Sequence, residues 1–137
     1  MSRRDIQPKG LGIVTFQIMA YVIAVAGVGL GIRFIFFGAS VLREWSIDVT
    51  DGALLMCRRY GLLYLGLAIM FLLGRNAPPS DLRSAVCIGI GAGSALLAGN
   101  GFWEFRAGRV SRGIIGPAVV EAVVAAGFAW AYWNGVN

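Results

Sequence analysis

Four long apolar runs, separated by short polar segments, make up most of the chain. They cover about residues 11–39, 52–74, 82–105 and 113–133, and each reaches the length of about 20 residues that a helix needs to cross a bilayer. A helix satisfies its backbone hydrogen bonds internally, as lipid requires, and short connections make consecutive helices run in opposite directions. The pattern therefore predicts an all-α fold: an integral membrane antiparallel four-helix bundle in which residues 1–137 form a single transmembrane domain.

The polar segments define two ends of this predicted bundle. End A holds the first and third loops, and end B holds both termini and the loop that contains Pro78 and Pro79. Residues 1–10 are polar and basic, and the apolar run after them is longer than the apolar region of a signal peptide, so we expect a retained tail. Lys and Arg are nearly balanced between the two ends, and the charges of the tail favour cytoplasmic termini.

Composition agrees with this picture and limits the chemistry. The chain is 58% hydrophobic and 14% charged, whereas a soluble domain carries about 25% charged residues. Its net charge of +5 comes from residues at the ends of the apolar runs, which favours lipid headgroups over nucleic acid as the partner. The absence of His excludes histidine bases, His-ligated haem or chlorophyll and most zinc or copper sites. We expect no cofactor, no metal and no catalytic residue.

The two cysteines do not predict a disulfide. Cys57 lies near the start of the second span and Cys87 near the start of the third. In an antiparallel pair of helices they come near opposite membrane faces, roughly 15–20 Å apart. A disulfide needs Cα atoms within about 7 Å of each other, so we expect two separate thiols inside the membrane.

Small residues and tryptophans mark two kinds of surface. Gly-x-x-x-Gly pairs in the first and third spans allow backbones to approach closely, so we expect these two spans to cross tightly. Alanines line one face of the fourth span. The predicted helix-packing positions are Gly27, Gly31, Gly89, Gly93, Ala118 and Ala122. Tryptophans near the ends of the spans are predicted interfacial anchors, namely Trp45, Trp103, Trp130 and Trp133.

Charged residues inside the apolar runs are the sharpest signals in the sequence. Arg58 and Arg59 lie in the second run and Glu121 in the fourth, and at about 1.5 Å per residue an arginine there can reach the glutamate. The same estimate pairs Arg33 with Glu104 near end A, and we expect Asn100 to be a buried polar residue in the same half of the bundle. A charge at this depth needs a partner or a function. Glu121 either fixes the helix register through an ion pair or a hydrogen bond, or takes part in a proton or ion relay.

Several features together resemble a broad set of small bacterial four-span proteins, the DoxX-like families. They are a glycine-rich first span ending in Arg33, the sequence Arg58-Arg59-Tyr60-Gly61 at the start of the second span, a glycine-rich third span and a short loop to the fourth. The resemblance covers most of the chain. It implies a multi-pass protein of the bacterial inner membrane, and it adds a quinone-linked redox function as one alternative.

The sequence favours a role without chemistry of its own. The absence of His, the lack of metal or nucleotide motifs and the glycine-rich helix faces predict an accessory or assembly subunit of a larger membrane complex. Its partners are then lipid and other membrane subunits, or a second copy of the chain. The first alternative is a small dimeric transporter or channel that uses Glu121 with Arg58 or Arg59, and the second is the quinone-linked redox protein.

Overall fold

The computed structural model describes residues 10–136, with side chains for residues 13–134. Within this range the chain is all-helical and has no strand. The helices are α1 (Gly10–Glu44), α2 (Asp51–Gly74), α3 (Asp81–Arg106), the short 3₁₀ helix η1 (Arg112–Ile114) and α4 (Ile115–Val136). Four of them are long and apolar enough to cross a membrane. The predicted tail of residues 1–10 lies outside the described residues, apart from Gly10.

The second and third helices begin where short polar side chains cap them. Thr50 caps α2 and accepts a hydrogen bond from the backbone N–H of Ala53. Asp51 is the first residue of the helix, where its negative charge interacts favourably with the helix dipole. Ser80 caps α3 in the same way through the N–H of Arg83. These two helices therefore match the predicted second and third spans to within one residue at each end.

The first helix is longer than predicted because apolar residues continue past residue 39. Val41 and Leu42 are buried, and α1 runs on to Glu44 after a kink at Phe37, whose backbone angles (φ −120°, ψ 24°) are not helical. The kinked segment brings the end of α1 to the start of the fourth helical stretch, where Ser111 donates from its backbone N–H to Trp45 and from its hydroxyl to Glu44.

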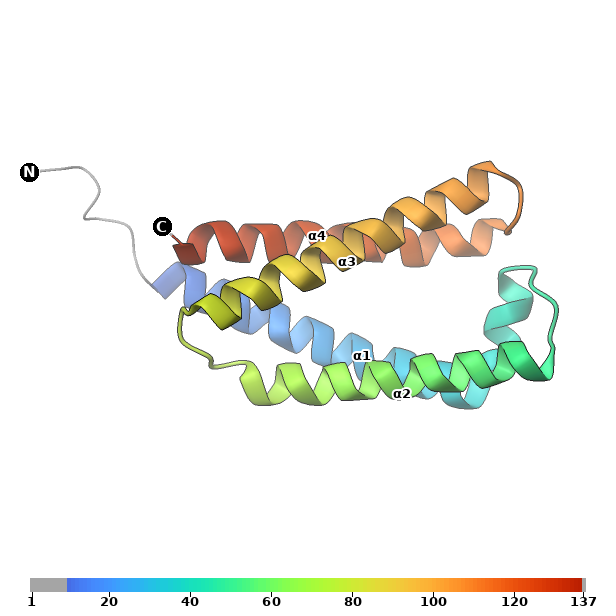
Figure 1. The fold of residues 1–137 in the computed structure, drawn as a ribbon, viewed down its shortest axis with the longest axis horizontal. Coiled ribbons are helices and arrows are strands. Elements are labelled where there is room, and N and C mark those ends of the chain that lie inside the picture. The colour runs from blue at the N-terminus through green and yellow to red at the C-terminus, as the bar shows by residue number, and fades with distance from the viewer. Residues whose placement is uncertain (1–9, 137) are drawn as a thin grey trace, which may run out of the picture.

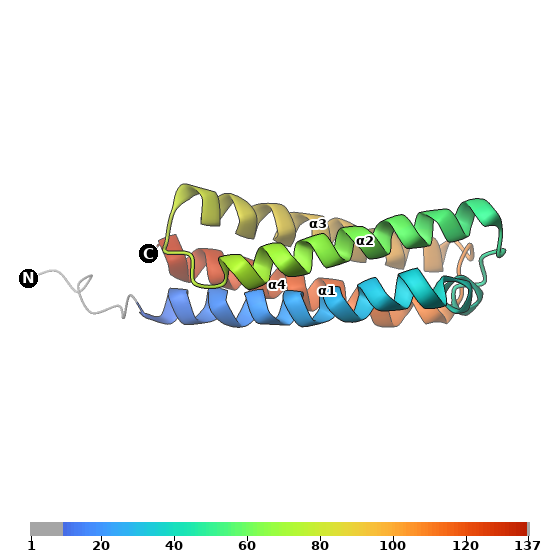
Figure 2. The ribbon, with the colours of Figure 1, turned by 90° about the horizontal axis from the view of Figure 1, so that it is seen from below.

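The helices are arranged as two pairs. α1 packs along α2, α3 packs along α4, and the pairs meet chiefly through α1 and α4. Figure 1 shows the pairs as two layers that lie close together at end B and farther apart toward end A, and Figure 2 shows the same helices from below, with α1 and α2 in front. End B holds the start of α1, the end of α4 and the connection between α2 and α3 (Figure 1). This arrangement leaves α2 and α3 without an extensive mutual contact among the described residues.

The apolar core lies in the half near end B and draws on all four long helices. Its largest side chains are Phe16 of α1, Phe71 of α2 and Phe128 of α4, and the rings of Phe71 and Phe128 lie 5.6 Å apart. Cys87 of α3 completes the contact between the two pairs. Many apolar side chains elsewhere face outward, for example Leu73 (77% exposed) and Leu82 (76% exposed). The outer surface is therefore as apolar as that of a helix in lipid.

Candidate functional site

The glycines of α1 and α2 form a tight contact between the two helices. A Cβ atom added at Gly27 would lie 2.9 Å from the backbone oxygen of Tyr64, and one at Gly31 would lie 3.0 Å from that of Gly61. The approach is mutual, since a Cβ at Gly61 would lie 2.8 Å from the oxygen of Gly31. Such distances leave no room for a side chain on either helix. The predicted packing role of Gly27 and Gly31 therefore applies to the contact between α1 and α2.

The prediction that the first and third spans cross tightly is wrong. α1 packs along α2 and α4, and a Cβ added at Gly89 or Gly93 of α3 would meet no atom within 4 Å. α3 uses other glycines for its own partner: a Cβ at Gly101 would lie 3.1 Å from that of Ala118. Gly89 and Gly93 lack a contact because α4, the helix that packs along α3, lies on a different side of α3 from these two glycines.

Gly89, Gly93 and Asn100 lie on one face of α3. Their spacing of four and then seven residues returns to nearly the same angle around a helix. Asn100 is exposed, contrary to its predicted place inside the bundle, and its side chain makes no hydrogen bond within the described part of the chain. This "open α3 face" thus combines two bare backbone positions with an amide that has no partner in residues 10–136.

A groove lies between α3 and α4, on another side of α3 from this face. It has a volume of about 470 Å³, and mostly small side chains line it, including Gly91, Ala92, Ala95, Ala125 and Ala129. Of the two alanines predicted to pack, Ala118 is buried against α3, whereas Ala122 is exposed. Cys87 at the groove and Cys57 on α2 are both buried, free thiols.

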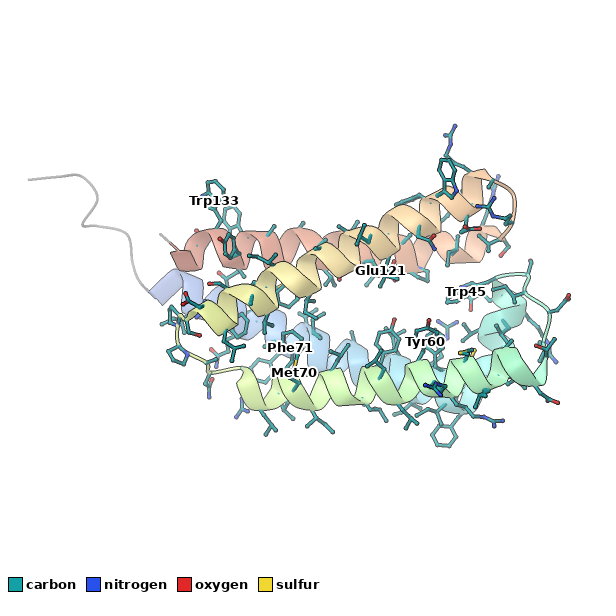
Figure 3. All side chains as sticks on the ribbon, in the orientation of Figure 1. Trp45, Tyr60, Met70, Phe71, Glu121 and Trp133 are labelled. Carbon is teal, nitrogen blue, oxygen red and sulfur yellow. The ribbon has the colours of Figure 1, made fainter. Side chains whose placement is uncertain are left out.

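The four tryptophans predicted as anchors lie toward the ends of the helices. Trp103, Trp130 and Trp133 are 61–70% exposed, and Figure 3 shows Trp133 pointing away from the helices near end B. Trp45 is partly buried and packs edge-on against Phe34, with 6.0 Å between the ring centres. It therefore takes part in internal packing as well as lying at end A.

The predicted ion pairs do not form, because most of the charges have closer partners. Arg33 binds Glu44 at the end of its own helix. Glu104 accepts two hydrogen bonds from Arg109, at 2.5 and 2.9 Å, so the predicted pair between Arg33 and Glu104 is wrong. This bond raises the pKa of Arg109 above its usual range. Arg33 is exposed, and Glu104 is only partly buried.

Arg58 and Arg59 are also exposed rather than buried. Neither makes a salt bridge within the described residues, so the predicted contact with Glu121 is absent from this structure. Their long side chains leave α2 about two turns after its start at end A, where arginine can extend its guanidinium toward headgroups.

Glu121 lies on the inward side of α4. It is three residues from Ala118 and three from Val124, and both of those residues are buried. The carboxyl is partly buried and close enough to Tyr64 of α2 for the two side chains to interact electrostatically. Figure 3 shows Glu121 beside the region between the two helix pairs, opposite Tyr60. In the described chain it has neither a hydrogen bond nor a salt bridge.

Arg83 is the most buried charged residue in the part of the chain that the structure describes. It is 5% exposed, with its guanidinium 4.6 Å from the centre of the Phe16 ring and a 3.3 Å hydrogen bond to the carbonyl of Ala77. The signal that identifies it is helical spacing, because Arg83 lies one turn before buried Cys87. The arginine therefore links α1, α3 and the connection before α3.

No group of three or more potential metal ligands occurs in the part of the chain that the structure describes. No protein-family model, curated protein or solved structure matches the chain. The resemblance to DoxX-like proteins therefore stays a prediction.

Proposed function

We propose that this chain is an accessory or assembly subunit that binds a transmembrane helix of another membrane protein on the open α3 face. In this proposal the four long helices form an antiparallel bundle across the inner membrane of a bacterium, with cytoplasmic termini. The lipid bilayer and the other subunit are its partners, and the chain itself needs no cofactor. The observation that supports the proposal is the open face of Gly89, Gly93 and Asn100.

The open α3 face has the chemistry of a helix contact in lipid. Without a hydrophobic driving force, helices in a bilayer associate where small residues allow close packing and where polar side chains hydrogen-bond across the contact. Gly89 and Gly93 provide the first property, and Asn100 provides an amide that lipid cannot satisfy. The partner helix should present small residues opposite the glycines and a hydroxyl or amide opposite Asn100.

The contact between α1 and α2 supports this interpretation from within the same molecule. There, glycines at the same spacing are covered by a helix so closely that no Cβ fits.

Native mass spectrometry on the tagged full chain, extracted from its own membrane in mild detergent, tests the proposal. We expect a defined assembly for the natural chain and its loss for Gly93→Leu, since the leucine occupies the space that the partner helix needs. Gly66→Leu is the matched control, because Gly66, like Gly93, lies in mid-helix with no atom within 4 Å of an added Cβ. A monomer or homodimer for the natural chain, or equal behaviour of the two variants, would contradict the proposal.

A further inference from the structure

Two cavities at the surface of the molecule lie along the same side of α3. The first is the groove between α3 and α4, whose lining on α3 includes Ala92 and Ala95. The second has a volume of about 240 Å³ and lies at the end of α3, where Trp103, Arg106 and Ala107 line it. Because residues eleven or fourteen positions apart return to nearly the same angle around a helix, Arg106 lies in line with Ala95 and Ala92. One elongated ligand can therefore reach both cavities along α3.

The surface between the two cavities is open and has the length of a lipid chain. Gly99 lies between Ala95 and Arg106 on this side of α3, and a Cβ added there would meet no atom within 4 Å. Arg106 follows Ala95 by eleven residues, which is a rise of about 16 Å along the helix. Half of a hydrocarbon core of about 30 Å is roughly 15 Å. An acyl chain whose headgroup lies at Arg106 therefore reaches the groove.

The cavity at the end of α3 offers a cation that no acid of the chain neutralises. Arg106 is exposed and makes no salt bridge within the described residues. The carboxylate nearest to it in sequence, that of Glu104, already binds Arg109. The last helix carbonyls, those of Trp103, Glu104 and Phe105, accept backbone hydrogen bonds of 3.0–3.1 Å from the turn that follows. The guanidinium of Arg106 is therefore available to an external anion.

Trp103 gives this cavity the chemistry of a membrane interface. Its side chain is 67% exposed, and tryptophan favours the headgroup level because its ring is apolar while its N–H is a donor. Arginine binds phosphate oxygens through parallel N–H donors. Figure 1 shows the end of α3 at the outer edge of the molecule, on the side away from α2. A lipid phosphate can thus approach the indole and the guanidinium from the bilayer.

We propose that these two cavities together bind one anionic glycerophospholipid. Arg106 binds the phosphate, the indole of Trp103 contacts the glycerol region, and an acyl chain runs past Gly99 into the groove beside Ala95. The site rests on the part of the proposed function that places the four long helices across a membrane. It does not need the partner helix, because the groove lies on another side of α3 from the open α3 face.

Native mass spectrometry of the purified full chain in a non-ionic detergent, titrated with dioleoylphosphatidylglycerol, tests the site. We expect saturable binding to the natural chain and about tenfold weaker binding to Arg106→Gln, because hydrogen bonds between two charged groups are lost. Arg59→Gln is the matched control, since Arg59 is also an exposed arginine without a salt bridge within the described residues. It removes the same charge and should bind within about twofold of the natural chain.

A groove variant separates the acyl chain from the headgroup. Ala95→Leu places extra atoms where the chain enters the groove, so it should weaken binding of the dioleoyl lipid about fivefold. Binding of dihexanoylphosphatidylglycerol should not change, because its short chains do not reach Ala95. Circular dichroism checks that each variant is as helical as the natural chain.

Three results would overturn the lipid site. They are equal binding of dioleoylphosphatidylcholine and dioleoylphosphatidylglycerol to the natural chain, equal losses in Arg106→Gln and Arg59→Gln, and an Ala95→Leu variant that does not distinguish the long lipid from the short one. Extraction of native membranes with alkaline carbonate tests the membrane placement separately. A chain that stays in the membrane but binds no phosphatidylglycerol would overturn the lipid site alone, whereas a chain released by alkali would overturn the proposed function as well.

Discussion

The two glycine-rich helices α1 and α3 contain the same motif in opposite environments. Gly27 and Gly31 of α1 lie against the backbone of α2, and an added Cβ at either position would come within 3.0 Å of an atom of α2. Gly89 and Gly93 of α3 have the same spacing, yet an added Cβ at either would meet nothing within 4 Å. The spacing of the glycines therefore shows that another helix can approach the backbone closely. The structure shows whether a helix of this chain does approach it.

The difference arises from the neighbours of each helix. α2 follows α1 after a short connection and presents Gly61 directly opposite Gly31, so both helices contribute to the close approach. α4 follows α3 but contacts it through Gly91 and Gly101, which lie on another side of α3. A mutation in the contact between α1 and α2 should therefore change the stability of the chain. A mutation on the open α3 face should change the association of the chain with its partner.

The largest effect on stability is expected for Gly61→Ala. The new Cβ would lie 2.6 Å from Ile35 Cγ1 and 2.8 Å from the backbone oxygen of Gly31, and a backbone cannot move aside as a side chain can. We expect a loss of about 1–3 kcal/mol in the free energy of unfolding, measured by denaturation in detergent micelles. Gly66→Ala, on the same helix with no atom in range, should leave stability unchanged or raise it. Equal losses in both variants would show that the close contact is not present.

A smaller effect is expected for Arg83→Gln, which tests how the two helix pairs are held together at end B. The change removes the guanidinium that lies over the Phe16 ring and its hydrogen bond to Ala77. We expect a loss of about 1–2 kcal/mol in the free energy of unfolding. Arg75→Gln is the control, because Arg75 is also an arginine at this end but is less buried. If the two variants lose the same stability, burial of Arg83 contributes nothing.

The smallest effect on stability is expected for Gly93→Leu in the purified chain. A Cβ added at Gly93 meets no atom within 4 Å, and leucine replaces a residue of low helix propensity by one of high propensity. The midpoint of denaturation in detergent should therefore equal or exceed that of the natural chain. A clear fall in this midpoint would mean that Gly93 packs inside the molecule, and the proposed docking face would then be wrong.

The sequence predicts the helices well because their signals are local. Long apolar runs and short polar side chains such as Ser80 locate α2 and α3 to within one residue. The end of α1 was missed because Val41 and Leu42, which look like part of a loop next to Arg43 and Glu44, pack inward after the kink.

Contacts between helices are harder to predict because they depend on rotation about each helix axis. Depth along the bundle suggested that Arg33 meets Glu104, yet each has a partner close by in sequence, Glu44 and Arg109. Glu121 was recognised as unusual from its apolar neighbours, but its proximity to Tyr64 could not be predicted. The burial of Arg83 could not be predicted either, because an arginine near a helix end normally extends toward the headgroups.

The most direct test of the central claim is cross-linking in the native membrane from a photoreactive residue placed at Gly93, compared with the same residue at Gly66. The open α3 face predicts one cross-link from position 93 to a transmembrane helix of another protein, and its loss when Asn100→Leu is added. Position 66 should label lipid only. The claim would be contradicted if both positions gave the same products, if position 93 linked only to lipid or to a second copy of the chain, or if Asn100→Leu had no effect.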